Sequence, residues 1–98
     1  MLDLLLMKKS FPLHLPGKAD ARVLDAIKHE VRKYVRRELN KAQSDGIRRP
    51  LFTCVVGTSA ADAAESPLKN VSAAIDRVAQ TGADHVYIAI KSAPVILP

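Results

Sequence analysis

Residues 22–38 read RVLDAIKHEVRKYVRRE, and this stretch sets the architecture of the chain. At about 100° per residue, its apolar side chains fall on one arc roughly 120° wide, the pattern of a helix packed on one side. We predict a helix over residues 19–41, with Asp20 in the first turn, where a carboxylate stabilises the helix N-terminus. The apolar arc consists of Val23, Leu24, Ile27, Val31, Tyr34 and Val35.

The opposite side of this helix is basic. Between Lys28 and Arg49 the chain has eight basic and three acidic residues, which accounts for its whole net charge of +5. Lysine and arginine recur at i, i+4 spacing, so several cations lie on one line about 15 Å long. This row is the strongest functional feature of the sequence. Its members are Lys28, Arg32, Lys33, Arg36 and Arg37.

A row of like charges predicts a polyanionic partner. Cations at i, i+4 repel one another by roughly a few tenths of a kcal/mol per pair, and phosphate backbones compensate such a row through counterion release. We therefore predict a non-enzymatic domain that binds RNA, DNA or a ribonucleoprotein surface. The scarcity of aromatic residues argues against sequence-specific binding of single strands. The alternatives are a structural or oligomerisation module whose basic helix is merely solvated and, third, a small enzyme.

Three strands and a second helix complete the expected fold. Residues 10–15 alternate between apolar and polar, and Pro12 places this strand at a sheet edge because proline cannot donate a ladder hydrogen bond. Residues 51–56 and 85–91 are β-branched and apolar, typical of covered strands. Ser66 and Pro67 are expected to start the second helix, and Gly82 to end it.

The order β-α-β-α-β predicts an α/β (α+β) domain, a small two-layer sandwich with a three-stranded sheet and two helices packed on one face. Parallel neighbouring strands would require right-handed crossovers. We expect the domain to span residues 7–91, with residues 1–6 as an N-terminal extension and 92–98 as a tail. The open edge at Pro12 and the apolar tail at 95–97 also suggest a homodimer formed by strand addition.

Composition restricts the class of protein. The 98 residues suit one domain, and a chain with no tryptophan and only two Phe and two Tyr must have an aliphatic core. No stretch approaches the length of about 20 apolar residues that a membrane span needs, so no membrane partner is expected. The single cysteine, Cys54, lies in an apolar run, which favours a buried thiol and a cytoplasmic location.

The remaining candidate sites are weak. His14, His29, His85 and Cys54 have no metal-ligand spacing, so no metal, cofactor or catalytic group is predicted from them. His14 and His85 could meet on the outer face of the sheet. Asp25 and His29 form an i, i+4 pair without an adjacent nucleophile. Gly17 and Lys18 precede a helix N-terminus and could hold an anion, although the full phosphate-loop spacing is missing.

The N-terminal part resembles a known family. The block from Met7 to Leu13, the pair Gly17-Lys18 and the run from Arg22 to Tyr34 resemble short bacterial proteins described only as a domain of unknown function. The resemblance is best over Met7–Glu38 and looser over 71–90. It implies that Met7 is a natural start, which leaves open whether Met1 or Met7 begins the protein. It implies no activity and no small-molecule ligand.

Overall fold

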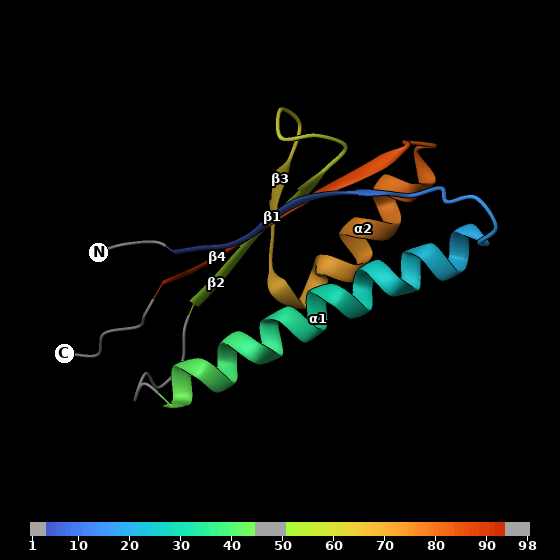
Figure 1. Ribbon diagram of the computed structural model, residues 1–98. Helices are drawn as coiled ribbons and strands as arrows, with labels where there is room; N and C mark the ends of the chain where they lie inside the picture. The colour runs from blue at the N-terminus through green and yellow to red at the C-terminus, as the bar shows by residue number, and fades with distance from the viewer. Residues whose placement is uncertain (1–3, 45–50, 94–98) are drawn as a thin grey trace.

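A computed structural model describes residues 4–44 and 51–93 and gives a four-stranded antiparallel sheet with both helices on one side (Figure 1). The order of strands across the sheet is β1-β4-β2-β3. The elements are β1 (Leu4–Pro12), α1 (Asp20–Ser44), β2 (Leu51–Gly57), β3 (Ala64–Ser66), the 3-10 turn η1 (Leu68–Asn70), α2 (Val71–Gln80) and β4 (His85–Ala93).

The expected two-layer α+β class is confirmed, while the strand count and order differ from the prediction. β1 and β2, the strands that α1 connects, are not neighbours, because β4 lies between them and pairs antiparallel with both. The last described strand, β4, therefore lies between the first two, β1 and β2. All neighbouring strands among the described residues are antiparallel, so the rule on right-handed crossovers between parallel neighbours does not apply to them.

The fourth strand, β3, was missed because the sequence predicts a helix start there. Ser66 pairs with Cys54 in the β2–β3 hairpin instead of capping a helix. Pro67 is the N-cap of η1, and α2 begins only at Val71. A three-residue strand is too short for the alternation of apolar and polar residues to be recognised.

β1 lies at the sheet edge, as Pro12 predicted, but it covers Leu4–Pro12 and not 10–15. Leu4 pairs with Ser92 and Leu5 with Lys91, so the strands β1 and β4 run into both segments that were expected to lie outside the domain. The expected turn at Asp45, the cations Arg48 and Arg49, and the apolar tail at 95–97 lie outside the described residues.

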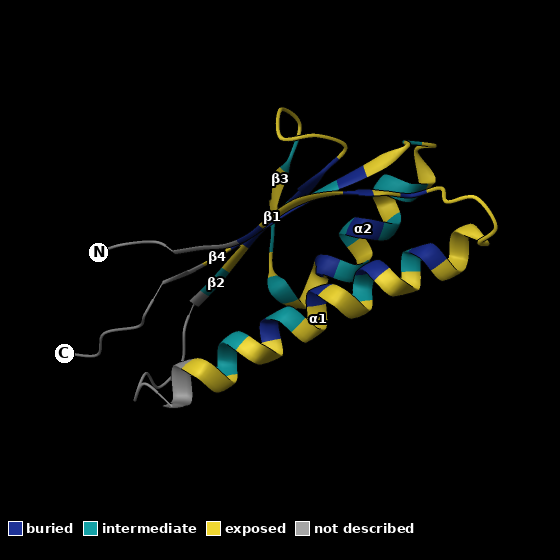
Figure 2. Cartoon of the chain, viewed as in Figure 1, coloured by how far each residue is buried: buried dark blue, intermediate teal, exposed yellow. Residues whose placement is uncertain are grey.

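The core lies between the sheet and the two helices (Figure 2). The apolar arc of α1 is confirmed, since its central members are buried and Leu24 and Tyr34 pack at its margin. Gly82 follows α2 with φ +80°, as expected for a residue that ends a helix. The buried side chains that the helices and sheet contribute include Val23, Ile27, Val31, Val35, Cys54, Val71, Ile75, Val86, Ile88 and Ile90.

Candidate functional site

Four members of the predicted row lie exposed on the outward side of α1 (Figure 2). They lie on two successive turns as two adjacent pairs, and the residue before each pair, Val31 or Val35, faces the core. In the described part of the chain, none of the four has an acidic ion-pair partner. We call these residues the α1 row: Arg32, Lys33, Arg36 and Arg37.

Lys28, the fifth member of the predicted row, is directed elsewhere. Its Nζ lies 2.6 Å from Oδ1 of Asp76 on α2, and only 16% of its side chain is exposed. The ion pair ties the two helices together and compensates the charge of Lys28. A carboxylate on α2, 48 positions away in the sequence, could not be assigned to Lys28 from the helical pattern alone.

Glu30, one of the acids of α1 near the row, is engaged with the sheet. Glu30 Oε1 lies 3.7 Å from Nζ of Lys9 on β1, and Lys9 in turn lies 4.8 Å from the centroid of the Phe11 ring. Both partners of the ion pair are about half exposed, so it contributes little to stability. Its effect on the site is to turn the Glu30 carboxylate toward the sheet.

A groove with an apolar floor runs beside the α1 row. It has a volume of about 390 Å³ and lies between α1 and the start of α2. Arg32 and Arg36 stand on its α1 side and Lys69 of η1 on the other. Lys69 is a cation that sequence reasoning missed, because it lies on an element that was not predicted. The floor consists of Val31, Val35, Leu39, Leu68 and Val71.

The histidines form no shared site. His14 Nδ1 lies 3.0 Å from Oδ1 of Asp20, and this hydrogen bond, with the charge of Asp20, raises the pKa of His14 above its ordinary value of 6.5. The contact joins the end of the β1 segment to the first turn of α1. In the described residues there is no group of three or more His, Cys, Asp and Glu side chains that could hold a metal ion.

The other weak candidates also have structural roles. Cys54 is fully buried in the core, and burial raises the pKa of its thiol, which makes it a poor nucleophile at neutral pH. The backbone N–H of Lys18 donates to the carbonyl of Leu15 at 3.2 Å, so this amide closes a turn at Gly17 (φ +77°) and does not point at a ligand.

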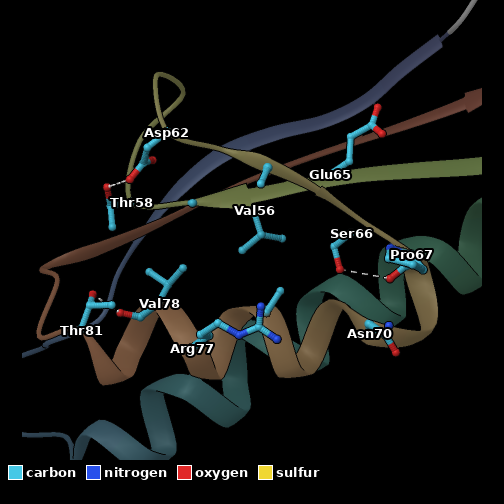
Figure 3. Close-up of a pocket in the computed structure, with 13 residues that line it drawn as sticks. Val56, Thr58, Asp62, Glu65, Ser66, Pro67, Asn70, Arg77, Val78 and Thr81 are labelled. Carbon is cyan, nitrogen blue, oxygen red and sulfur yellow. Dashed lines mark hydrogen bonds between the residues drawn. The ribbon is translucent and has the colours of Figure 1, made fainter.

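A second pocket lies between the β2–β3 hairpin and α2 (Figure 3). Its volume is about 410 Å³, and Arg77 is the only cation among the described residues that line it. Asp62 accepts hydrogen bonds from the Thr58 hydroxyl and, at 2.8 Å, from the Ser59 N–H, which lower its pKa. Glu65 points away from Arg77. The described lining residues include no histidine or cysteine, and the titratable acids among them are Asp62 and Glu65.

The chain matches a family model described as "Family of unknown function (DUF6172)" over residues 7–96. The chain belongs to DUF6172. Comparison with curated proteins and with solved structures gave no significant match. The resemblance seen in the sequence is thereby confirmed as a family of unknown function.

The residues that match the DUF6172 model include the whole candidate site. The match begins within β1 and includes the α1 row, Lys69, the groove and the pocket of Figure 3. Neither of the described helices of this DUF6172 chain has the length and apolar character needed to cross a membrane.

Proposed function

We propose that this DUF6172 chain binds nucleic acid, either directly or on a ribonucleoprotein surface, through the α1 row. The observation that supports the proposal is the set of four exposed cations on two turns of one helix, without acidic partners in the described part of the chain. In this proposal the function of the protein is binding and not catalysis. It acts in the cytoplasm, where a lone thiol such as Cys54 stays reduced.

The physical basis of the binding is the release of counterions. Each phosphate that a cation neutralises frees condensed ions, so affinity falls steeply as salt rises. Phosphates carry no sequence information, and the α1 row therefore binds without strong sequence preference. Lys69, across the groove from Arg32 and Arg36, adds a further cation on the same side of the molecule.

The test is fluorescence anisotropy of labelled duplex DNA and duplex RNA, titrated with the protein at several salt concentrations. For the wild type we expect a log–log salt slope of about −3 or steeper. The double variant Arg32→Glu/Arg36→Glu is expected to abolish binding while leaving the melting temperature nearly unchanged, because both side chains are exposed.

The matched control is Lys8→Glu/Lys91→Glu, which reverses two exposed cations on the sheet. Both double variants lower the net charge from +5 to +1, so a difference between them reports position and not total charge. Duplex affinity that is equal in the two variants, or unchanged by reversal of the α1 row, would overturn the proposal.

A homodimer is the second candidate, favoured by the position of β1 at the sheet edge. β1 pairs with β4 on one side only, which leaves a strand edge for a second copy. Lys8 and Lys9 oppose this pairing, because adjacent charges on an edge strand disfavour strand addition. Light scattering coupled to size-exclusion chromatography distinguishes the two: a concentration-dependent dimer supports this candidate, and a monomer at all concentrations excludes it.

A further inference from the structure

The face of the sheet that points away from the helices has its own composition. Along β4, Val86, Ile88 and Ile90 point to the helices and are 0% exposed. The residues between them therefore point the other way, because side chains alternate along a strand. Cross-strand pairing extends this set to the neighbouring strands. We call it the open face: Lys8, Ser10, Thr53, Val55, Glu65, Tyr87, Ala89 and Lys91.

The open face lies outside the aliphatic core. Ala89 is only 4% exposed, yet it does not belong to the contiguous core cluster, and neither Tyr87 nor Val55 packs against that cluster. Both helices lie on the opposite side of the sheet, so no described helix covers the open face (Figure 1).

Tyr87 is the aromatic residue of this face, and its cross-strand neighbours are small. Ser10 of β1 lies opposite it on one side and Gly57 of β2 on the other. Neither residue is large enough to cover a phenol ring, and Tyr87 is accordingly partly exposed. Ser10 leaves room beside the ring on the β1 side, whereas on the β2 side the hairpin occupies the space at Gly57, where a Cβ would lie 2.6 Å from Oδ1 of Asp62.

The cations of the open face lie together on its β1 and β4 strands. Lys8 lies opposite Ala89, one pair along from Tyr87, and Lys91 lies opposite Thr53, one pair further. Both lysines are exposed. The acids lie on the other side of the face: Glu65 on β3 at the far edge of the sheet, and Asp62 of the β2–β3 hairpin next to Gly57. The cations therefore lie within about 15 Å of the ring, at roughly 3.4 Å per residue along a strand and 4.8 Å between strands.

We propose that the open face binds unpaired nucleotides, with one base stacked on Tyr87 and the adjoining phosphates at Lys8 and Lys91. A base within a duplex has no free π-face for such stacking, whereas every base of a single strand has one. A single ring reads no base edge, so this binding is independent of sequence. It does not rest on the α1 row, which lies in the helix layer on the other side of the sheet.

The two tyrosines of the chain provide a direct test. The protein has no tryptophan, so in the variant Tyr34→Phe all intrinsic emission comes from Tyr87. Titration with single-stranded oligo(dT) is expected to quench this emission saturably, because stacking brings the base onto the ring. Duplex DNA of equal nucleotide concentration is expected to leave it unquenched. The reverse variant, Tyr87→Phe, retains only Tyr34, whose emission oligo(dT) should not quench.

Affinity measurements complete the test. By anisotropy with labelled oligo(dT), Tyr87→Leu should weaken binding about tenfold, whereas Tyr87→Phe, which keeps the π-face, should bind like the wild type. Lys8→Glu/Lys91→Glu should also weaken binding of the single strand. Circular dichroism confirms that each variant folds.

The outcome is separable from that of the α1 row. In Arg32→Glu/Arg36→Glu combined with Tyr34→Phe, quenching of Tyr87 by oligo(dT) should persist even where duplex binding is lost. The proposal is overturned if oligo(dT) leaves Tyr87 emission unchanged, or if Tyr87→Leu binds it as tightly as Tyr87→Phe. It is also overturned if Tyr87 is protected by a concentration-dependent dimer, because a second copy of the chain then occupies the face.

Discussion

The two faces of β4 differ in what a substitution on them should change. Toward the helices the strand presents Ile88 and Ile90, both fully buried, and burial of such a side chain stabilises the fold by about 1.5–3 kcal/mol. Toward the open face it presents Tyr87 and Lys91, which are partly or fully exposed. Adjacent residues of one strand thus have different roles. Substitutions at inner positions should change the free energy of unfolding, and substitutions at outer positions should change binding affinity.

The largest expected effect is at Ile88, in the centre of the inner face. Ile88→Ala removes buried methyl groups and leaves a cavity, so we expect the free energy of unfolding to fall by about 3 kcal/mol. Urea denaturation followed by circular dichroism measures the change. If the alanine variant does not fold, Ile88→Val should still fold and lose about 1 kcal/mol.

The matched control is Lys91→Ala, on the same strand and the opposite face. Because Lys91 is exposed, its removal should change the free energy of unfolding by no more than about 0.5 kcal/mol. Equal losses for the inner and outer variants would contradict the difference between the two faces.

A smaller effect is expected at Gly57, which lies next to Tyr87 on the outward side. At this position a larger residue should destabilise the fold. A Cβ at Gly57 would lie 2.6 Å from Cα of Ala63 and 2.6 Å from Oδ1 of Asp62. The backbone of the hairpin would have to shift, and we expect Gly57→Ala to lose about 2 kcal/mol by urea denaturation.

Gly82→Ala is the comparison for Gly57→Ala. Gly82 has φ +80° but open space around it, so its alanine variant should lose only about 1 kcal/mol, through backbone strain alone. A Gly57→Ala variant as stable as the wild type would show that the hairpin yields to the added methyl group without cost.

The parts of the fold that sequence predicted are those set by local periodicity. The apolar and basic sides of α1 follow from the 3.6-residue repeat, and the buried positions Val23, Ile27 and Val31 were all identified in this way. Cys54 was correctly placed inside because its neighbours are apolar. Pro12 placed β1 at an edge because a proline lacks the N–H that an interior strand needs.

The parts that could not be predicted depend on residues far apart in the sequence. Nothing local shows that β4 inserts between β1 and β2. The same holds for Lys28, whose partner Asp76 lies on the other helix, and for Lys69, which reaches the groove only after η1 has formed. No local pattern predicts that Ser10 and Gly57 lie beside Tyr87, since the pairing register of the strands sets both neighbours. The candidate surfaces thus needed the tertiary structure.

The smallest expected effect concerns the contact between His14, in the segment that follows β1, and Asp20, the first residue of α1. Because the folded-state pKa of His14 is raised above 6.5, the charged form is favoured in the folded protein. Its contribution to stability is fully present below the unfolded pKa, near 6.5, and is lost as pH rises through the higher folded value. An NMR titration of the His14 ring protons should therefore give a pKa above 6.5. Asp20→Asn should bring it back toward 6.5, apart from the smaller contribution of Asp84, whereas Asp25→Asn should leave it unchanged. Equal pKa values in all three proteins would mean that the two side chains do not pair in solution, which would leave the core and the Lys9–Glu30 ion pair to join β1 to α1.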